Sequence, residues 1–152
     1  ARYVREKYPD AKTVMVSPCV GKRSESCLYD EVDYVISYEE IEALFKASNI
    51  DLEALEPMPL DPNIVGHGRG FAMISGVTES VKLTAPDPNV IKEVVIDGLN
   101  KQVIRQLKQY AKAGQCPGNF IEVMSCPGGC VNGCDTINNP KTAARQILPT
   151  TK

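Results

Sequence analysis

Three cysteines near the end of the chain follow one another at intervals that suit a soft metal. Cys126, Cys130 and Cys134 are separated by three residues each, and proline and glycine lie between the first two. Glycine lets the backbone turn sharply and lets amide N–H groups approach a sulfur atom closely. A fourth thiol, Cys19, lies far upstream in the stretch SPCVGKRSE. Thiolates on such loops are the usual ligands of iron–sulfur clusters, so these residues predict iron–sulfur chemistry.

Zinc is the alternative metal for the same thiols. Four thiolates also suit structural zinc. The known zinc patterns, however, use pairs of cysteines with two residues between them, whereas Cys126, Cys130 and Cys134 have three. We favour iron and keep zinc open. Cys27 and Cys116 lie outside both motifs and are interpreted as packed or partly exposed thiols. His67 is interpreted as a loop residue that binds no ligand, and the acidic residues at 30–33 as a solvated face.

Composition argues against several other functions. The chain has 152 residues, 43% of them hydrophobic, and a net charge of −2, so it can bury one core and has no electrostatic reason to bind nucleic acid or a membrane. No apolar run reaches the roughly 20 residues of a membrane span, and no signal peptide is recognisable. Clustered cysteines in a chain of this size favour ligation in a reducing compartment over disulfides. We therefore expect a cytoplasmic protein.

Apolar runs alternate with helical patterns along the chain. Short runs rich in β-branched residues predict four strands, at 13–16, 33–36, 90–96 and 120–124. Ser37 and Glu40 form a capping box that predicts a helix after the second strand. Apolar spacing around 77–83 and 103–110 predicts two more helices. The proline- and glycine-rich stretch at 52–70 predicts a long loop.

Strands that alternate with helices indicate an α/β fold. We expect a four-stranded, mostly parallel sheet flanked by helices, in a single lobe that spans residues 1–152. Cys19 and Cys126 each follow a predicted strand. Because the carboxyl ends of parallel strands share one edge of a sheet, these thiols are expected to meet there.

Two stretches resemble the catalytic domain of the FeFe hydrogenases, whose second and third cluster motifs read M-P-C-x-x-K-x-x-E and E-x-M-x-C-x-x-x-C-x-x-G-G-G. The chain has SPCVGKRSE from Ser17 and EVMSCPGGCVNGCD from Glu122. VDYVIS and SGVTES are similar to two further family segments, with Thr78 where the family has methionine. The resemblance implies the C-terminal lobe of a two-lobed hydrogenase domain. Because the family's first cluster motif is absent and the chain begins at Ala1, we expect a fragment of a longer chain.

The resemblance also implies which thiols bind the metal. Cys19, Cys126 and Cys130 would be three of the four thiolates of a 4Fe-4S cluster. Cys130 would also bridge to the two-iron subsite where hydrogen reacts. Together these groups form the H-cluster of a full-length hydrogenase, and the fourth thiolate would lie outside this chain.

Three further residues match family positions beside the cluster. Lys22 matches the lysine that donates a hydrogen bond to a cyanide of the two-iron subsite, and Glu25 matches the carboxylate of the proton path. Met124 matches the methionine that packs beside the bridging region. Without the motifs, Lys22 and Glu25 would be interpreted as a surface pair and Met124 as core filler. The motif context favours the functional interpretation, more for Lys22 than for Glu25.

Two departures from the family pattern bear on function. Ser17 replaces the methionine before Pro-Cys, and the closing triple glycine is here Gly133-Cys134-Asp135. The thiol of Cys134 and the carboxylate of Asp135, in place of two glycines, would change the polarity around the cluster and therefore its redox potential. Such divergence resembles the hydrogenase-like domains of sensory proteins. Our interpretation is a domain that senses hydrogen or redox state, with reversible hydrogen chemistry at a low rate in the whole protein and none in the fragment alone.

Two other functions stay open. One is a catalytic FeFe hydrogenase, and the other is a non-enzymatic iron–sulfur carrier or assembly factor of the cytosolic type. Retention of Lys22 and Glu25 argues against the second, because a carrier has no cyanide ligand and no proton path. The expected partners are the N-terminal lobe of the same protein and either a signalling output domain or a ferredoxin-like electron donor.

Overall fold

The computed structural model describes residues 1–59 and 66–148. These residues fall into two compact units. Unit 1 contains residues 1–59 and 134–137, and unit 2 contains residues 66–133 and 138–148. None of the helices in the described part of the chain is long and apolar enough to cross a membrane.

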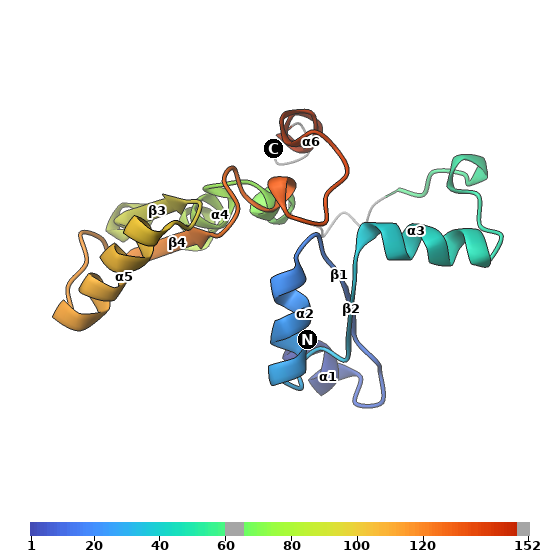
Figure 1. Ribbon diagram of the computed structural model, residues 1–152, viewed down its shortest axis with the longest axis horizontal. Coiled ribbons are helices and arrows are strands. Elements are labelled where there is room, and N and C mark those ends of the chain that lie inside the picture. Colours follow the sequence, from blue (N-terminus) through green and yellow to red (C-terminus); the bar gives the residue numbers. More distant parts are fainter. Residues whose placement is uncertain (60–65, 149–152) are drawn as a thin grey trace. The chain divides into compact units, whose positions relative to one another are not determined.

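Unit 1 is built on a pair of parallel strands with a helix between them in sequence. Strands β1 (Val14–Val16) and β2 (Tyr34–Ile36) pair with Met15 opposite Val35, and α2 (Val20–Leu28) connects them (Figure 1). This confirms the strands predicted at 13–16 and 33–36. The other elements of the unit are α1 (Arg2–Lys7), α3 (Tyr38–Ala47) and the 3-10 helix η1 (Leu52–Ala54).

The start of α3 is the predicted capping box. The Ser37 hydroxyl accepts a hydrogen bond from the Glu40 backbone N–H at 3.2 Å, and the Glu40 carboxylate accepts one from the Ser37 N–H at 2.7 Å. Both interactions satisfy N–H groups that would otherwise lack a partner. The chain therefore leaves β2 and enters α3 directly.

Asp33 joins the beginnings of the two strands of unit 1. Its carboxylate accepts hydrogen bonds from the Thr13 N–H at 2.8 Å and the Thr13 hydroxyl at 2.9 Å, and it pairs with Lys12 and Arg5. The Thr13 N–H and hydroxyl, followed by Lys12, hold the pKa of Asp33 well below its ordinary value. The prediction of a solvated acidic face at 30–33 is therefore wrong for Asp33, because its charge is used within the fold.

Unit 2 contains a second parallel pair. Strands β3 (Glu93–Asp97) and β4 (Phe120–Met124) pair along their whole length, with Val95 opposite Glu122, and α5 (Lys101–Ala113) connects them. The strand predicted at 120–124 and the helices predicted around 77–83 and 103–110 are confirmed. The remaining elements are η2 (Gly66–Ala72), α4 (Gly76–Thr84), η3 (Pro88–Val90), η4 (Cys130–Asn132) and α6 (Pro140–Ile147).

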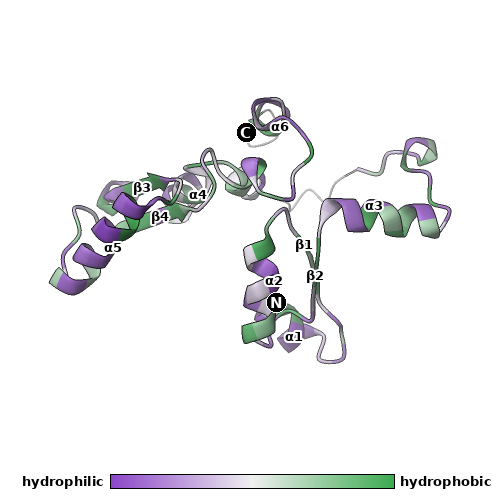
Figure 2. Ribbon diagram, viewed as in Figure 1, coloured by the Kyte–Doolittle hydropathy of each residue, from purple (hydrophilic) through white to green (hydrophobic). Residues whose placement is uncertain are grey.

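The long connecting helix of unit 2 is amphipathic. Asn100 caps it by accepting hydrogen bonds from two backbone N–H groups, and it ends at Gly114, whose φ of 63° is in the left-handed region. Val103, Leu107 and Tyr110 are half-buried, and most of the other residues of the helix are hydrophilic (Figure 2). The helix therefore packs through one narrow apolar stripe.

The prediction of one four-stranded sheet is wrong. Within the described residues the strands form two separate two-stranded parallel sheets, β1 with β2 and β3 with β4. Apolar periodicity predicts that a segment is a strand, whereas the choice of a neighbour depends on tertiary contacts. Cys19 and Cys126 therefore follow strands of different sheets, so the expectation of a shared sheet edge is wrong, and their meeting in space stays a prediction. The loop predicted at 52–70 contains η1 and the beginning of η2, and its residues 60–65 lie outside the described residues.

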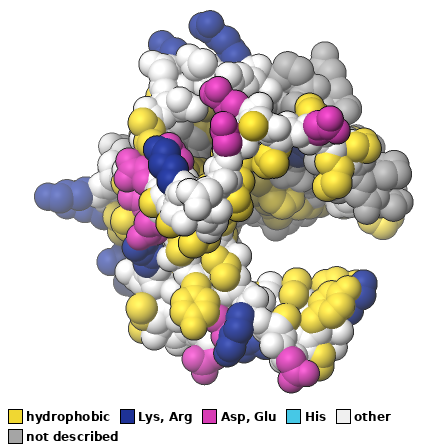
Figure 3. All heavy atoms as spheres, turned by 90° about the vertical axis from the view of Figure 1, so that its right-hand side faces the viewer, with side chains coloured by type: hydrophobic (Ala, Val, Ile, Leu, Met, Phe, Trp, Pro, Cys, Tyr) yellow, Lys and Arg dark blue, Asp and Glu magenta, His cyan; other side chains and the backbone are white. Residues whose placement is uncertain are grey.

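The hydrophobic core of the described residues is small. Ile96 and Val131 are the buried hydrophobic residues there, whereas large apolar side chains such as Leu44 and Leu28 are 56% and 75% exposed. Apolar side chains are visible at the surface in Figure 3. Large exposed apolar patches are typical of sites that bind a protein partner, a membrane or a ligand.

Candidate functional site

The loop that carries Cys126 and Cys130 begins directly after β4. The Gly129 N–H donates to the Cys126 carbonyl oxygen at 3.0 Å, and η4 starts at Cys130. Gly128 and Gly129 have φ values of 83° and 98°, which side chains rarely tolerate. The sharp turn that the sequence predicted between the two cysteines is confirmed. Both cysteines are half-buried.

Three neighbouring segments hold this loop in place. The Asp97 carboxylate, at the end of β3, accepts a hydrogen bond from the Gly128 N–H at 2.5 Å. The Ile74 N–H donates to the Gly128 carbonyl oxygen at 3.1 Å. The Asn132 side-chain amide donates to the Pro127 carbonyl oxygen at 3.0 Å. Hydrogen bonds from protein groups alone therefore hold the loop, and such preorganisation lowers the entropic cost of ligation.

Gly129 also allows a close approach. A Cβ atom at this position would lie 2.6 Å from the Ala72 carbonyl oxygen and 2.7 Å from the Ile74 backbone nitrogen. Both contacts are far closer than ordinary van der Waals packing. The glycine between the cysteines is thus required by the backbone behind the loop, in addition to its own positive φ.

Cys19 lies in unit 1, at the end of β1 as predicted. The Ser17 N–H donates to the Ile36 carbonyl oxygen at 2.9 Å, and Ser17 is buried. Cys19 occupies the N-cap position of α2 but makes no capping hydrogen bond with its side chain. A Cβ atom at Gly21 would lie 3.4 Å from the Cys19 sulfur, so the helix leaves room beside the thiol.

Cys134 lies beside the Cys19 turn in unit 1. Its sulfur is 4.0 Å from the Pro18 carbonyl oxygen, and the Asp135 N–H donates to the same oxygen at 3.3 Å. Cys134 is exposed. The residue that replaces a family glycine is therefore packed against the peptide next to the predicted ligand Cys19.

Lys22 and Glu25 form an ion pair on the surface of α2. Their charged groups are 2.5 Å apart, and their side chains are 42% and 53% exposed. Together with Met15 and Tyr29 they line a small cavity of about 110 Å³ between α2 and the sheet. The two residues are brought together, and their roles toward a two-iron subsite stay predictions.

The other predicted residues lie apart from these contacts. Met124, the last residue of β4, is half-buried, and its carbonyl oxygen accepts from the Gly98 N–H at 2.9 Å. Cys27 is exposed and Cys116 half-buried. No group of three or more His, Cys, Asp or Glu side chains placed to hold a metal ion is found among residues 1–59 and 66–148. Binding of iron–sulfur or of zinc therefore stays a prediction.

Sequence reasoning missed two residues behind the cysteine loop. Glu122 and Thr78 are 4% and 1% exposed, and the Glu122 carboxylate accepts hydrogen bonds from Thr78. The sequence contained a clue to each residue. Glu122 is a charged residue between Ile121 and Val123 in a predicted strand, and Thr78 stands where the family has methionine. Asp97 was also missed, and its position at a strand end was the only indication.

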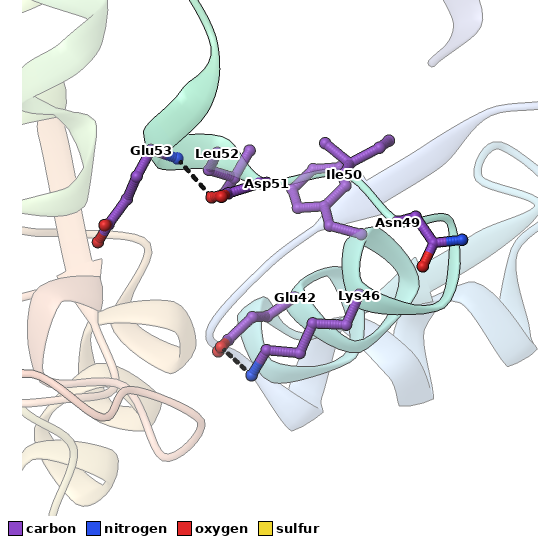
Figure 4. Close-up of a pocket in the computed structure, with 8 residues that line it drawn as sticks. Glu42, Lys46, Asn49, Ile50, Asp51, Leu52 and Glu53 are labelled. Carbon is purple, nitrogen blue, oxygen red and sulfur yellow. Dashed lines mark hydrogen bonds and ion pairs between the residues drawn. The ribbon is translucent and has the colours of Figure 1, made fainter.

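A wider pocket in unit 1 has no thiol. It has a volume of about 560 Å³ and lies between the end of α3 and η1 (Figure 4). Phe45, Ile50 and Leu52 provide its apolar wall, and the Glu42–Lys46 ion pair lies at its rim. Its lining has carboxylates but neither a thiol nor an imidazole, the usual ligands of iron–sulfur clusters.

Fold and site together define an α/β protein with thiol-bearing turns at the ends of parallel strands. The sequence model of the family "Iron only hydrogenase large subunit, C-terminal domain" matches residues 1–134. The chain belongs to this family, which confirms the resemblance drawn from the cysteine motifs.

Similar proteins of two kinds are found. The cytosolic iron-sulfur assembly component 3 of Rattus norvegicus is 27% identical, over 89% of this chain and 37% of the relative. The cytosolic Fe-S cluster assembly factor narfl of Xenopus tropicalis is 27% identical, over 89% and 37%. The periplasmic Fe hydrogenase large subunit of Nitratidesulfovibrio vulgaris is 28% identical, over 80% and 38%. The chain thus spans less than two-fifths of the length of these relatives.

Proposed function

We propose that the protein containing this chain is a cytosolic iron–sulfur protein of the assembly type, which holds a cluster and does not turn over hydrogen. Two of the relatives named above are cytosolic iron–sulfur assembly proteins. The sensing function expected from the sequence has no support among the named relatives, which are assembly proteins and a hydrogenase.

The surface ion pair of Lys22 and Glu25 is the observation that carries this choice. In a hydrogenase, Lys22 would donate to a cyanide of the two-iron subsite; here its ammonium group pairs with the Glu25 carboxylate on the same helix, a contact that involves no cyanide. An exposed pair at this spacing is common on helix surfaces and needs no functional explanation. Retention of the two residues therefore no longer argues against an assembly protein.

Cys19, Cys126 and Cys130 are the proposed ligands. They are soft donors, and two of them lie on one preformed loop whose backbone is held by Asp97 and Ile74. This donor set fits an iron–sulfur cluster, and we propose the 4Fe-4S type. A bound cluster would supply one-electron chemistry or sulfide-bridged iron for transfer.

The remainder of the polypeptide is the proposed partner. The described residues bury few apolar side chains, and the chain spans 37% of the rat relative. We propose that an N-terminal lobe of the same protein covers the exposed apolar surface and supplies the fourth thiolate. An electron-donating partner is needed if the cluster changes oxidation state during function.

Cluster binding is tested on the full-length protein. After anaerobic reconstitution with ferrous iron and sulfide, iron and sulfide per chain and the EPR spectrum of the reduced protein are measured. We expect Cys126→Ser to lose most of the signal, while the matched control Cys27→Ser, at an exposed thiol, keeps it. Stoichiometric zinc with no iron-dependent signal would establish the zinc alternative instead.

A hydrogenase is the second candidate function, supported by the Nitratidesulfovibrio vulgaris relative and by Lys22, Glu25 and Met124 at motif positions. Infrared bands of iron-bound carbonyl and cyanide, and hydrogen evolution from reduced methyl viologen, separate the two candidates. We expect neither in protein purified anaerobically from its own host. Bands and hydrogen evolution that change in Lys22→Ala would establish the hydrogenase.

A further inference from the structure

A buried carboxylate stands in the middle of the strand that leads to Cys126. Glu122 is 4% exposed, whereas its neighbours Ile121 and Val123 are 37% and 41% exposed. Successive side chains of a strand point to opposite faces, so β4 turns its charged residue inward and its apolar neighbours outward. This inverts the usual pattern of strands in a folded protein.

Glu122 binds the first turn of α4. One carboxylate oxygen accepts hydrogen bonds from the Thr78 backbone N–H at 2.8 Å and from the Thr78 hydroxyl at 2.5 Å. Ser75, at the N-cap position of α4, has a φ of 66° and makes no capping hydrogen bond with its side chain. Glu122 therefore satisfies an N-terminal donor of the helix from a strand 44 residues away in sequence.

The residues just before α4 form the wall behind the cysteine loop. The Ile74 N–H donates to the Gly128 carbonyl oxygen at 3.1 Å, and Gly129 lies directly against Ala72 and Ile74. Glu122 thus joins β4, which Cys126 follows two residues after its end, to the helix α4, and the segment just before α4 holds Gly128. This contact links the strand that precedes the loop to the segment that holds the middle of the loop.

The contact is kept at a cost. The second carboxylate oxygen of Glu122 is buried and has no hydrogen-bond partner among residues 1–59 and 66–148. An unsatisfied buried acceptor destabilises a fold, and such violations gather at functional sites. The Thr78 hydroxyl also distinguishes this chain from the family motif, which has methionine there.

We propose that Glu122 and Thr78 are positioning residues that hold the Cys126–Cys130 loop in the conformation in which its thiolates bind the cluster. The proposal rests on the proposed function, because it names the residues that organise the same site. Its prediction for the metal-free protein does not depend on iron, since the loop is fixed by hydrogen bonds that need no metal.

The test compares two threonines of α4 in the full-length protein. Thr78→Val removes the hydroxyl that reaches Glu122, and Thr84→Val removes one whose hydrogen bond to Ser80 stays within the helix. In metal-free protein, amide exchange of residues 126–133 and alkylation of Cys126 are expected to become about five- to tenfold faster in Thr78→Val. Thr84→Val is expected to leave both rates unchanged, and Thr78→Ser to restore them.

A second variant tests the carboxylate itself. Glu122→Gln keeps the size of the side chain and one oxygen that Thr78 can reach, whereas Glu122→Leu removes both. We expect faster alkylation in Glu122→Leu, a smaller effect in Glu122→Gln, and a changed EPR line shape after reconstitution. If Glu122→Leu fails to fold, the Thr78 series decides.

The proposal is overturned if Thr78→Val lowers the melting temperature but leaves the alkylation rate and the EPR line shape equal to those of Thr84→Val. In that case the contact only stabilises the fold. If the wild-type protein takes up no iron, the proposed function fails, while the alkylation rates of the metal-free variants still decide whether Glu122 and Thr78 hold the loop.

Discussion

The Asp97 carboxylate accepts a hydrogen bond from the backbone N–H of Gly128 at 2.5 Å. Asp97 is the last residue of β3, and Gly128 lies between the two cysteines that follow β4. Because β3 and β4 pair in parallel, their carboxyl ends lie together, with Asp97 opposite Met124. A residue of one strand thereby holds the cysteine loop that follows the neighbouring strand.

Asp97→Ala is expected to loosen the cysteine loop without unfolding unit 2. A hydrogen bond to a charged group contributes about 1.5–3 kcal/mol, so exchange of the Gly128 amide should become at least tenfold faster. Hydrogen exchange of the metal-free protein measures this. Asp97→Asn retains an acceptor oxygen, so its exchange rate at Gly128 should lie between those of wild type and Asp97→Ala. Asp10→Ala, at an exposed carboxylate, is the control. Equal exchange rates in wild type and Asp97→Ala would contradict the assigned role.

The two glycines of the loop should respond differently to alanine. Gly129→Ala places a Cβ atom 2.6 Å from the Ala72 carbonyl oxygen at a φ of 98°, whereas a Cβ atom at Gly128 meets nothing within 4 Å. We expect Gly128→Ala to cost about 1–2 kcal/mol for backbone conformation alone, and Gly129→Ala to cost about 4 kcal/mol or more. Urea unfolding monitored by circular dichroism measures both, and equal losses would show that the wall formed by Ala72 yields.

Asp33 should make the stability of unit 1 depend on pH. Hydrogen bonds from Thr13, followed by Lys12, lower the pKa of Asp33 in the folded state. A lowered folded-state pKa stabilises the fold above the unfolded-state pKa of about 4, and this contribution is lost as the pH falls toward the folded-state value. Asp33→Asn should therefore be less stable than wild type at neutral pH, and the difference should shrink below about pH 4.

Urea unfolding of both proteins across this pH range tests the assignment. Glu39→Gln, at an exposed carboxylate of α3, is the control for loss of one negative charge. A stability difference between wild type and Asp33→Asn that stays constant from neutral to acid pH would show that ionisation of Asp33 does not contribute.

Local structure followed from particular residues of the sequence. Ser37 and Glu40 predicted the start of α3. An apolar face of Val103, Ile104, Leu107 and Tyr110 predicted α5, although Ile104 is exposed in the structure. The strand ending at Met124 was predicted with its observed bounds. These features depend on neighbours within one or two turns, so a single sequence contains the information.

Tertiary relationships were harder to predict. Four strands of similar composition gave no indication that β2 and β3 would not pair with each other, because the choice of a neighbouring strand depends on how the intervening residues pack. The cysteines of the site were found because thiols have few other uses at such spacing. Glu122 and Asp97 were missed because their importance comes from contacts with Thr78 and Gly128, which lie far from them in sequence.

Cys134 provides the last prediction, because it lies beside the predicted ligand Cys19 without occupying a family ligand position. Its sulfur is 4.0 Å from the Pro18 carbonyl oxygen. Cys134→Gly should leave the iron content of the reconstituted full-length protein unchanged, because the proposed ligands together with a thiolate from the rest of the protein complete the cluster. The midpoint potential should shift by some tens of millivolts, since polarity and hydrogen bonding near a cluster set its potential. Redox titration followed by EPR measures this, with Cys27→Ser as the control at an exposed thiol. Loss of iron in Cys134→Gly would instead make Cys134 a ligand and would indicate a cluster of different architecture.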